Sequence, residues 1–287
     1  MLTAIVGQSG SVIWLPAETR FELVTGGWVF MCSCPLKVRR AVNAPDLISR
    51  NRLLAVLSPA DRELIAPALE AVELDVRQIL EAPGEPIAHV YFVESGLVSV
   101  VGETSKGHRI EVGMIGSEGM TGLAVVLADG RSRNQTIVQS AGSAMRLSAR
   151  SLAEAVAASR TLTFAILRYA HLFMLQNTQT ALANGRGRLD ERLARWLLMW
   201  HDRMERDTLI VTHEFLALLL GVRRPGVTDA LHVLEGKGLI RTTRSRVHIR
   251  DRSGLQLAAN GFYGMPEAEY DRLMRSARAQ RPIALGS

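Results

Sequence analysis

The sequence predicts an α+β chain: an N-terminal antiparallel β-roll, a long helix and a C-terminal winged helix-turn-helix. Short alternating strands separated by Gly and Pro run from about residue 72 to 148, which is typical of an antiparallel roll or barrel. A helical pattern follows from residue 151. Residues 212–252 then show the pattern of two short helices, a tight turn and a basic β-hairpin.

These patterns divide the 287 residues into segments. A chain of this length is expected to hold two domains. The expected segments are a poorly ordered extension at 1–45, the β-roll at 52–150, connecting and dimerisation helices at 151–185, the winged helix-turn-helix at 186–253, and a C-terminal helix and tail at 254–287. The extension mixes Gly, Trp and Pro without a clear period, and Met31 is a candidate for a later start.

The roll is expected to follow a helix that begins at Ser58 and Pro59, since Ser caps helices and Pro suits the first helical position. Its buried stripe is predicted to be Leu64, Ile65, Ala68 and Leu69. Within the roll, strands are predicted at 90–93 and 97–101. Turns are predicted at 83–86, 95–96, 106–107, 116–119, 129–130 and 141–142.

The long helix carries a short heptad seam. Its members are Phe164, Leu167, His171, Met174, Thr178 and Ala181. Two interpretations stay open: the seam packs on the chain's own β domain, or it pairs with the same helix of a second copy, which we favour. Gly185 and Gly187 are expected to end this helix, and a further helix follows with Leu189, Leu193, Trp196, Leu197 and Trp200.

The winged helix-turn-helix is predicted from local chemistry. Thr212 is expected to cap the first helix, with Glu214 at the positive end of its dipole. Gly221 stands where the turn needs a positive φ, and Pro225 is placed at the first position of the second helix.

The second helix has two different faces. Val227, Ala230, Leu231 and Leu234 form a stripe to be buried, whereas Thr228, Asp229 and His232 lie opposite. Gly236 and Gly238 should end the helix before a hairpin that begins at 239–240. Residues 223–252 hold eight Lys or Arg against three acids, so contact with phosphates is expected. The alternative is an ordinary helical hairpin with a solvated charged face.

The whole chain carries a formal charge of +6, which suits a polyanionic partner. Cys32 and Cys34 are too close along an extended chain for a good structural disulfide, so a reducing cytoplasm is the expected compartment. No apolar run approaches the ~18–20 residues of a membrane span, and no secretion signal is recognisable.

The order of a β-roll, a long helix and the stretch LLGVRRPGVTDALHVLEGKGLI resembles the catabolite activator and fumarate-nitrate regulator (Crp/Fnr) family of bacterial transcription factors. The resemblance spans roughly residues 52–252. It implies that the roll binds an effector and is cyclic-nucleotide-binding-like, that the long helix forms a homodimer through Leu167, His171, Met174 and Thr178, and that the second helix enters the DNA major groove. The expected partners are double-stranded DNA and a second copy, with RNA polymerase as a further candidate.

The resemblance places the DNA contacts on named residues. Family members usually offer Arg, Glu and Arg to the bases, and by order these positions are Arg224, Pro225 and Asp229. Only the first is kept, so the best-known operator of the family is not transferred to this chain. The predicted DNA-binding residues are Arg223, Arg224, Thr228, Asp229, His232, Arg244 and Arg246.

The effector site departs from the cyclic-nucleotide pattern. Gly122 is followed by Leu123 where the family has a ribose-binding Glu, and Arg133 is followed by Asn134 where it has Ser. We therefore expect a different effector at Gly122, Arg133 and Asn134, or a roll that is only a scaffold. A cyclic-nucleotide-dependent regulator is the alternative.

Other chemistry is not expected. Two cysteines are too few for an iron–sulfur cluster with four cysteinyl ligands. Haem would need an axial ligand such as His89, His108 or His171, and lone histidines are usually packing or surface residues. A cupin-type oxygenase is the rival from another class, but residues 72–148 hold no pair of metal ligands at the required spacing. We predict no cofactor, no metal and no catalysis.

Overall fold

The computed structural model describes residues 2–6, 12–16, 38–41, 49–204 and 206–279. The chain divides into two units, Met1–Lys37 and Val38–Ser287. In the first, strands β1 (Leu2–Val6) and β2 (Val12–Pro16) pair as an antiparallel hairpin. Poor order was predicted for residues 1–45, and of this segment the structure describes only β1, β2 and β3, so most of it lies outside the described residues.

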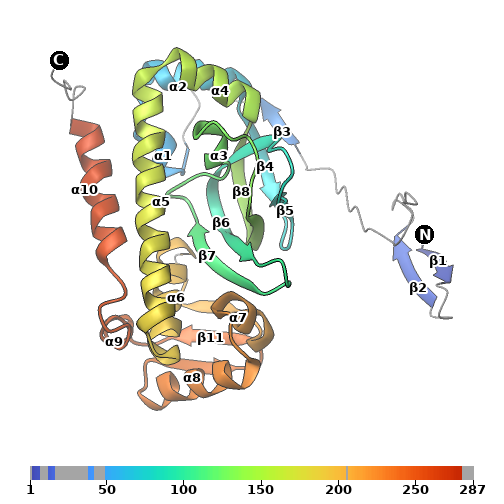
Figure 1. The fold of residues 1–287 in the computed structure, drawn as a ribbon, viewed down its shortest axis with the longest axis vertical. Helices are drawn as coiled ribbons and strands as arrows, with labels where there is room; N and C mark the ends of the chain where they lie inside the picture. Colours follow the sequence, from blue (N-terminus) through green and yellow to red (C-terminus); the bar gives the residue numbers. More distant parts are fainter. Residues whose placement is uncertain (1, 7–11, 17–37, 42–48, 205, 280–287) are drawn as a thin grey trace. The chain divides into compact units, whose positions relative to one another are not determined.

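The second unit begins with the predicted β-roll (Figure 1). Helices α1 (Arg52–Ala55), α2 (Pro59–Ile65) and the 3-10 helix η2 (Ala66–Ala68) precede most of the roll, and α3 (Leu123–Val126) is set into it. Its strands are β3 (Val38–Ala41), β4 (Glu70–Leu74), β5 (Ile79–Glu81), β6 (His89–Glu103), β7 (Arg109–Ile115) and β8 (Gln135–Ser148). They pair antiparallel in the order β3-β4-β8-β6-β7, and β5 also pairs with β8, as expected for this fold class.

Two predicted turns of the roll are instead irregularities within long strands. Residues 95–96 lie inside β6 and residues 141–142 inside β8, and the register between these strands shifts there. Gly96 has φ +85°, and a Cβ on Gly142 would lie 2.0 Å from the Ser95 carbonyl oxygen. The two glycines thus allow close approach of paired backbones, which is a second use of glycine besides a chain reversal.

Helix α2 begins as predicted, because the Ser58 hydroxyl oxygen accepts the Asp61 backbone N–H. Its predicted buried stripe is only half correct: Ile65 and Leu69 are buried, whereas Leu64 is 44 % exposed and Ala68 is also exposed. The helix ends at Ile65 and gives way to η2, so the α-helical spacing does not continue to residue 68.

Two helices follow the roll, α4 (Ala149–Ala158) and α5 (Arg160–Arg186). Gly185 lies within α5, which ends only at Gly187, so the earlier of the two predicted breaks is wrong. Helix α5 packs on the roll with Leu162, Ile166, Tyr169, Leu172 and Gln176. All six residues of the heptad seam are exposed instead, so the seam does not pack on the chain's own β domain.

The winged helix-turn-helix has its predicted elements. They are α6 (Leu189–Met204), β9 (Thr208–Ile210), α7 (His213–Leu220), α8 (Arg224–Gly236), β10 (Ile240–Thr243) and β11 (Arg246–Ile249). The small sheet has the order β10-β11-β9. The core is continuous with the roll, because Leu97 of β6 and Met114 of β7 pack among its buried residues.

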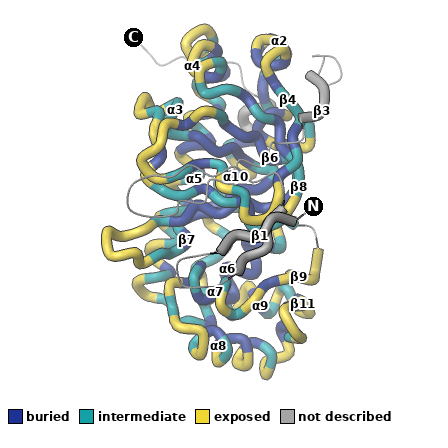
Figure 2. Tube along the Cα trace, turned by 90° about the vertical axis from the view of Figure 1, so that its right-hand side faces the viewer, coloured by how far each residue is buried: buried dark blue, intermediate teal, exposed yellow. Residues whose placement is uncertain are grey.

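The C-terminal segment forms α9 (Arg252–Ala258) and α10 (Met265–Ala279). Helix α10 lies alongside α5 in Figure 1 and contacts it. Figure 2 shows a mostly buried β6 and exposed residues over much of α8. None of the described helices is long and apolar enough to cross a membrane.

Candidate nucleic-acid interface and effector pocket

The turn between α7 and α8 has the predicted chemistry. The Thr212 hydroxyl oxygen accepts the Phe215 N–H at 3.2 Å, which caps α7. Gly221 ends α7 with φ +62°, a left-handed conformation that favours glycine. A Cβ on Gly221 would lie 2.8 Å from Cδ1 of Ile110 on β7. The turn therefore also lies directly against the roll.

Helix α8 starts at Arg224, one residue before the predicted start, with Arg223 at the N-cap. Pro225 is tolerated in the first turn, because the N–H groups there have no partner within the helix and the N–H that proline lacks is therefore not needed. The predicted stripe of Val227, Ala230, Leu231 and Leu234 is buried. This burial fixes which face of α8 remains available to a partner.

The outer face of α8 carries most of the predicted DNA-binding residues. Arg223, Arg224, Asp229 and His232 are exposed. Thr228 is only half-buried: its hydroxyl lies 2.9 Å from Nδ1 of His213 and donates to the Arg224 carbonyl oxygen at 3.3 Å. It is therefore less free than the sequence predicted.

One acidic neighbour of this face was missed. Glu214 of α7 forms an ion pair with Arg224, with 3.3 Å between Oε1 and Nη1, and both side chains are exposed. An exposed pair of this kind contributes little to stability, so Arg224 can exchange it for another partner. The sequence placed Glu214 at the helix dipole and gave no sign of its proximity to Arg224.

The β10–β11 hairpin forms the basic wing. Arg246 pairs across from Thr243, and Arg244 and Arg246 are both exposed. Glu235 at the end of α8 accepts hydrogen bonds from the backbone N–H of Thr242 at 2.7 Å and from the hydroxyl of Thr242 at 2.6 Å. These bonds lower the pKa of Glu235. One of the few acids in the segment is thus engaged at the wing's base, which leaves the wing arginines free to meet phosphates.

The roll holds a cavity of about 210 Å³ that brings together the predicted effector residues Gly122, Arg133 and Asn134. The cavity lies beside α3, and Phe173 reaches it from α5. Its polar or charged lining residues further include Glu81, Thr121, Asp129, Arg131, Ser132 and Thr136. The predicted residues therefore lie together at one cavity although the cyclic-nucleotide pattern is incomplete.

Glu81 is one of the cavity residues that the sequence did not predict. It is 9 % exposed, and its Oε1 accepts the Gly122 N–H at 2.7 Å. Leu123 does remove the acid from the family's position, but β5 brings a carboxylate to the same turn. No sequence motif indicates this residue, because it lies about 40 positions before Gly122 and comes close to that turn only in the folded chain.

Two arginines with exposed side chains also line the cavity. Arg131 donates through Nη1 to the Gly84 carbonyl oxygen at 2.8 Å and is exposed. Arg133 is exposed as well. A buried carboxylate combined with exposed guanidinium groups suits a small polar ligand that carries both an anionic group and a hydrogen-bond donor.

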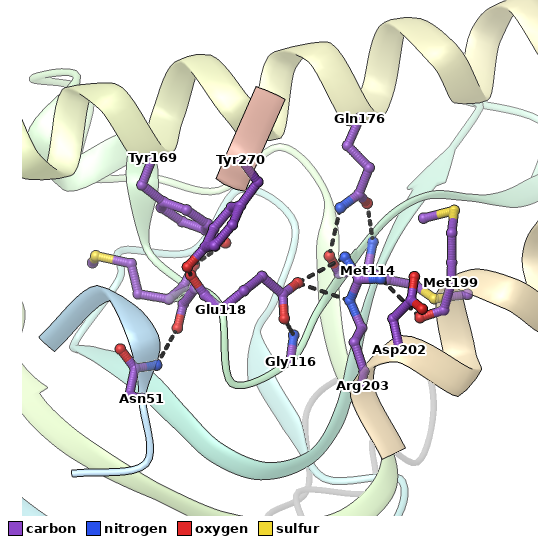
Figure 3. Close-up of polar contacts among 12 residues, drawn as sticks. Asn51, Met114, Gly116, Glu118, Tyr169, Gln176, Met199, Asp202, Arg203 and Tyr270 are labelled. Atoms are coloured by element: carbon purple, nitrogen blue, oxygen red, sulfur yellow. Dashed lines mark hydrogen bonds and ion pairs between the residues drawn. The ribbon is translucent and has the colours of Figure 1, made fainter. Parts of the chain in front are cut away.

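The turn before the cavity is joined to the DNA-binding domain. Glu118 Oε1 lies 2.7 Å from the guanidinium of Arg203 at the end of α6, and Glu118 also accepts the Gly116 N–H (Figure 3). Nearby, Nε1 of Trp196 on α6 donates to Glu111 on β7 at 2.8 Å. Burial raises the pKa of Glu111 to about 7. Both α6 side chains thus bind acids of the roll.

The candidate metal and haem ligands lie in different parts of the chain. Among the residues that the structure describes, no group of three or more His, Cys, Asp or Glu side chains is arranged to hold a metal ion. Cys32 and Cys34 lie outside those residues. The haem candidates His89, His108 and His171 lie on β6, in the β6–β7 turn and on the exposed seam of α5 respectively, and none of them lines the cavity.

Comparison with protein families identifies both halves of the fold. Residues 72–159 match the cyclic nucleotide-binding domain, and residues 191–258 match the Crp-like helix-turn-helix domain. Together these matches cover more than half of the chain. No curated protein matches the chain.

Solved structures share the arrangement. A putative Crp/Fnr-family transcriptional regulator from Eubacterium rectale is 19 % identical with a TM-score of 0.57, covering 73 % of this chain and 98 % of its own. A CRP-family regulator from Thermus thermophilus is 24 % identical with a TM-score of 0.55, covering 66 % and 96 %. The c-di-GMP-responsive global regulator CLP from Xanthomonas campestris is 20 % identical with a TM-score of 0.57, covering 67 % and 99 %.

These identities show a shared fold, and the family matches add the type of each domain. An effector-type roll precedes a Crp-like helix-turn-helix in the order that the sequence predicted, and the outer face of α8 and the wing are exposed and basic. The chain therefore belongs to the Crp/Fnr family and is a DNA-binding transcription regulator.

Proposed function

We propose that the chain works in the cytoplasm as a homodimer that binds an inverted-repeat operator. The observation that carries this proposal is the exposed seam of α5, opposite the face that packs on the roll. Phe164 and Leu167 are more than one-third exposed and Met174 is 64 % exposed. Apolar side chains aligned at heptad spacing and left in water favour pairing with the same helix of a second copy.

A dimer built on this seam would present two α8 helices to DNA. Recognition helices of such dimers enter successive major grooves, so half-sites are expected about 10 bp, or ~34 Å, apart. Arg224 is suited to fork onto guanine, with Thr228, Asp229 and His232 facing the groove. Arg223, Arg244 and Arg246 are suited to phosphate contacts, and no catalytic role is proposed.

Selection of bound sequences from random duplexes tests this function directly. We expect an enriched, imperfect inverted repeat, and sedimentation of the purified protein should give a dimer. An enriched single half-site or a direct repeat would refute the dimeric arrangement. Failure to enrich any motif would refute sequence-specific binding. RNA polymerase stays a candidate further partner of the DNA complex.

For the roll we propose an effector other than cyclic AMP, or a scaffold role if no effector exists. Leu123 removes the acid that holds the ribose hydroxyl in cyclic-nucleotide-binding members, and an unpaired buried hydroxyl costs about 1–3 kcal/mol. That loss weakens affinity about tenfold to over a hundredfold. The structural neighbour CLP, described as c-di-GMP-responsive, is an example of this fold with another type of effector.

A cyclic-nucleotide-dependent regulator remains the second candidate, and Glu81 favours it. A carboxylate beside Gly122 is chemically able to accept a ribose hydroxyl even though it comes from β5. Calorimetry with cyclic AMP and cyclic GMP, combined with operator binding in their presence and absence, separates the two candidates. Micromolar binding that tightens the DNA complex would favour the second one. No heat and no change in DNA affinity would favour the first.

A further inference from the structure

Helix α10 lies beyond residues 191–258 that match the helix-turn-helix domain, yet it is anchored to that domain at its start. Tyr263, two residues before it, donates its hydroxyl to Asp202 at 2.7 Å. The guanidinium of Arg195 on α6 donates to the Phe262 carbonyl oxygen at 3.0 Å. The residues just before α10 are therefore held by two side chains of α6, Arg195 and Asp202.

The body of α10 is held by the sensor half. Tyr270 and Met274 are buried in the core that the roll shares with α5. The Tyr270 hydroxyl donates to the Glu118 carbonyl oxygen at 2.9 Å. Arg52 of α1 lies 4.3 Å from the Tyr270 ring centre and pairs with Asp271 at 3.0 Å. One helix therefore joins the DNA-binding domain to the roll and α1.

The contacts that α6 and α10 make with the roll share one residue, Glu118. The carboxylate of Glu118 binds Arg203 of α6, while the backbone carbonyl of Glu118 binds Tyr270 of α10 (Figure 3). Arg203 and Glu118 are both largely buried, so water competes weakly for this pair. The same loop leads within four residues to Gly122 of the cavity. A loop that is held by both α6 and α10 transmits little movement unless one of these helices moves with it.

We propose that α10 is an intramolecular clamp, formed by Tyr270, Asp271 and Met274, that fixes the orientation of the DNA-binding domain on the sensor roll. The clamped arrangement leaves Arg223, Asp229 and the wing exposed, so it is compatible with DNA binding. Fixing the domain before DNA arrives reduces the entropy lost on binding two half-sites at once. This inference rests on the proposed dimeric operator binding.

The test uses the full chain with Tyr270→Ala, which removes both the ring and the hydroxyl. We expect about tenfold weaker binding to the selected operator, unchanged binding to random duplex, and faster hydrogen exchange in α6 and in residues 116–119. Tyr270→Phe should show a smaller change of the same kind, because only the hydroxyl is lost. Arg272→Ala is the matched control, since Arg272 pairs with Glu269 of its own helix and is exposed.

If Tyr270→Ala does not fold, Arg52→Ala provides the test, because it removes a half-exposed group that contacts Tyr270 and Asp271. Unchanged operator affinity in the folded variants would overturn the clamp, as would tighter binding, which would mean that the clamped orientation inhibits. Unchanged hydrogen exchange would overturn it without any DNA measurement. A wild-type chain that selects no operator would instead refute the proposed function.

Discussion

Gly221→Ala probes the contact between the helix-turn-helix and the roll. The residue has φ +62°, and the added Cβ would lie 2.8 Å from Cδ1 and 3.1 Å from Cγ1 of Ile110. A left-handed conformation costs a residue with a side chain about 1–2 kcal/mol. Displacing the tip of a flexible isoleucine adds roughly 1 kcal/mol, at the low end of the overpacking range. The expected loss in the free energy of unfolding is about 2–3 kcal/mol.

Urea unfolding followed by tryptophan fluorescence measures this loss, because Trp196 and Trp200 are buried in the core of the DNA-binding domain. Gly236→Ala is the matched control. It also lies in this domain, at the end of α8, but its added Cβ meets no atom within 4 Å. Alanine is a better helix former than glycine by about 0.5–1 kcal/mol, so this control should be neutral or stabilising.

A second change separates the two components of the expected loss. In the double variant Gly221→Ala, Ile110→Ala, the contact with Ile110 is absent and only the backbone strain remains. The double-mutant cycle should therefore give a coupling of about 1 kcal/mol. A coupling of zero with the full loss retained would mean that Ile110 plays no part. No loss in Gly221→Ala itself would refute the described turn.

Three other predictions address the carboxylate at the interface, the DNA contacts and the dimer. Burial raises the pKa of Glu111 to about 7, so the folded state binds its proton more tightly than the unfolded state. The contribution of this proton to stability should be complete below about pH 4.5 and be lost as the pH rises through about 7, and Glu111→Gln should abolish that part of the pH dependence in urea titrations. Arg224→Ala should relax discrimination at one half-site position by roughly 1–3 kcal/mol, whereas Arg246→Ala should weaken all duplexes equally and flatten the salt dependence; equal loss in both variants would contradict this division. Met174→Asp, at the 64 % exposed seam position, should shift sedimentation towards the monomer, and a persisting dimer would exclude this seam as the interface.

The helix-turn-helix was predictable because its determinants are local. Thr212 caps its helix through an N–H three residues away, and Gly221 adopts the positive φ that its own chemistry permits. The burial of Val227 and Leu231 follows from helical spacing alone. Each determinant needs only a few neighbouring residues, so the sequence contains it completely.

The strands of the roll were harder to predict because glycine has more than one use. Gly107 and Gly96 both have positive φ, at +79° and +85°, yet only the first lies in a chain reversal. The second faces β8, where the Ser140 carbonyl oxygen leaves no room for a Cβ. The difference depends on a partner strand some 40 residues away, so no local pattern distinguishes a bulge from a turn.

The same non-local origin applies to the effector cavity and limits any argument from a missing motif residue. The sequence showed that Leu123 stands where the resembling family has an acid, and it gave no indication of another carboxylate beside Gly122. Folding instead brings Glu81 from β5 to within 2.7 Å of the Gly122 nitrogen, where it is 9 % exposed. A carboxylate thus reaches this turn from β5 and not from the position after Gly122. Glu81, Leu123 and Arg133 all line this cavity, so the missing acid at position 123 does not by itself define what the cavity can accept.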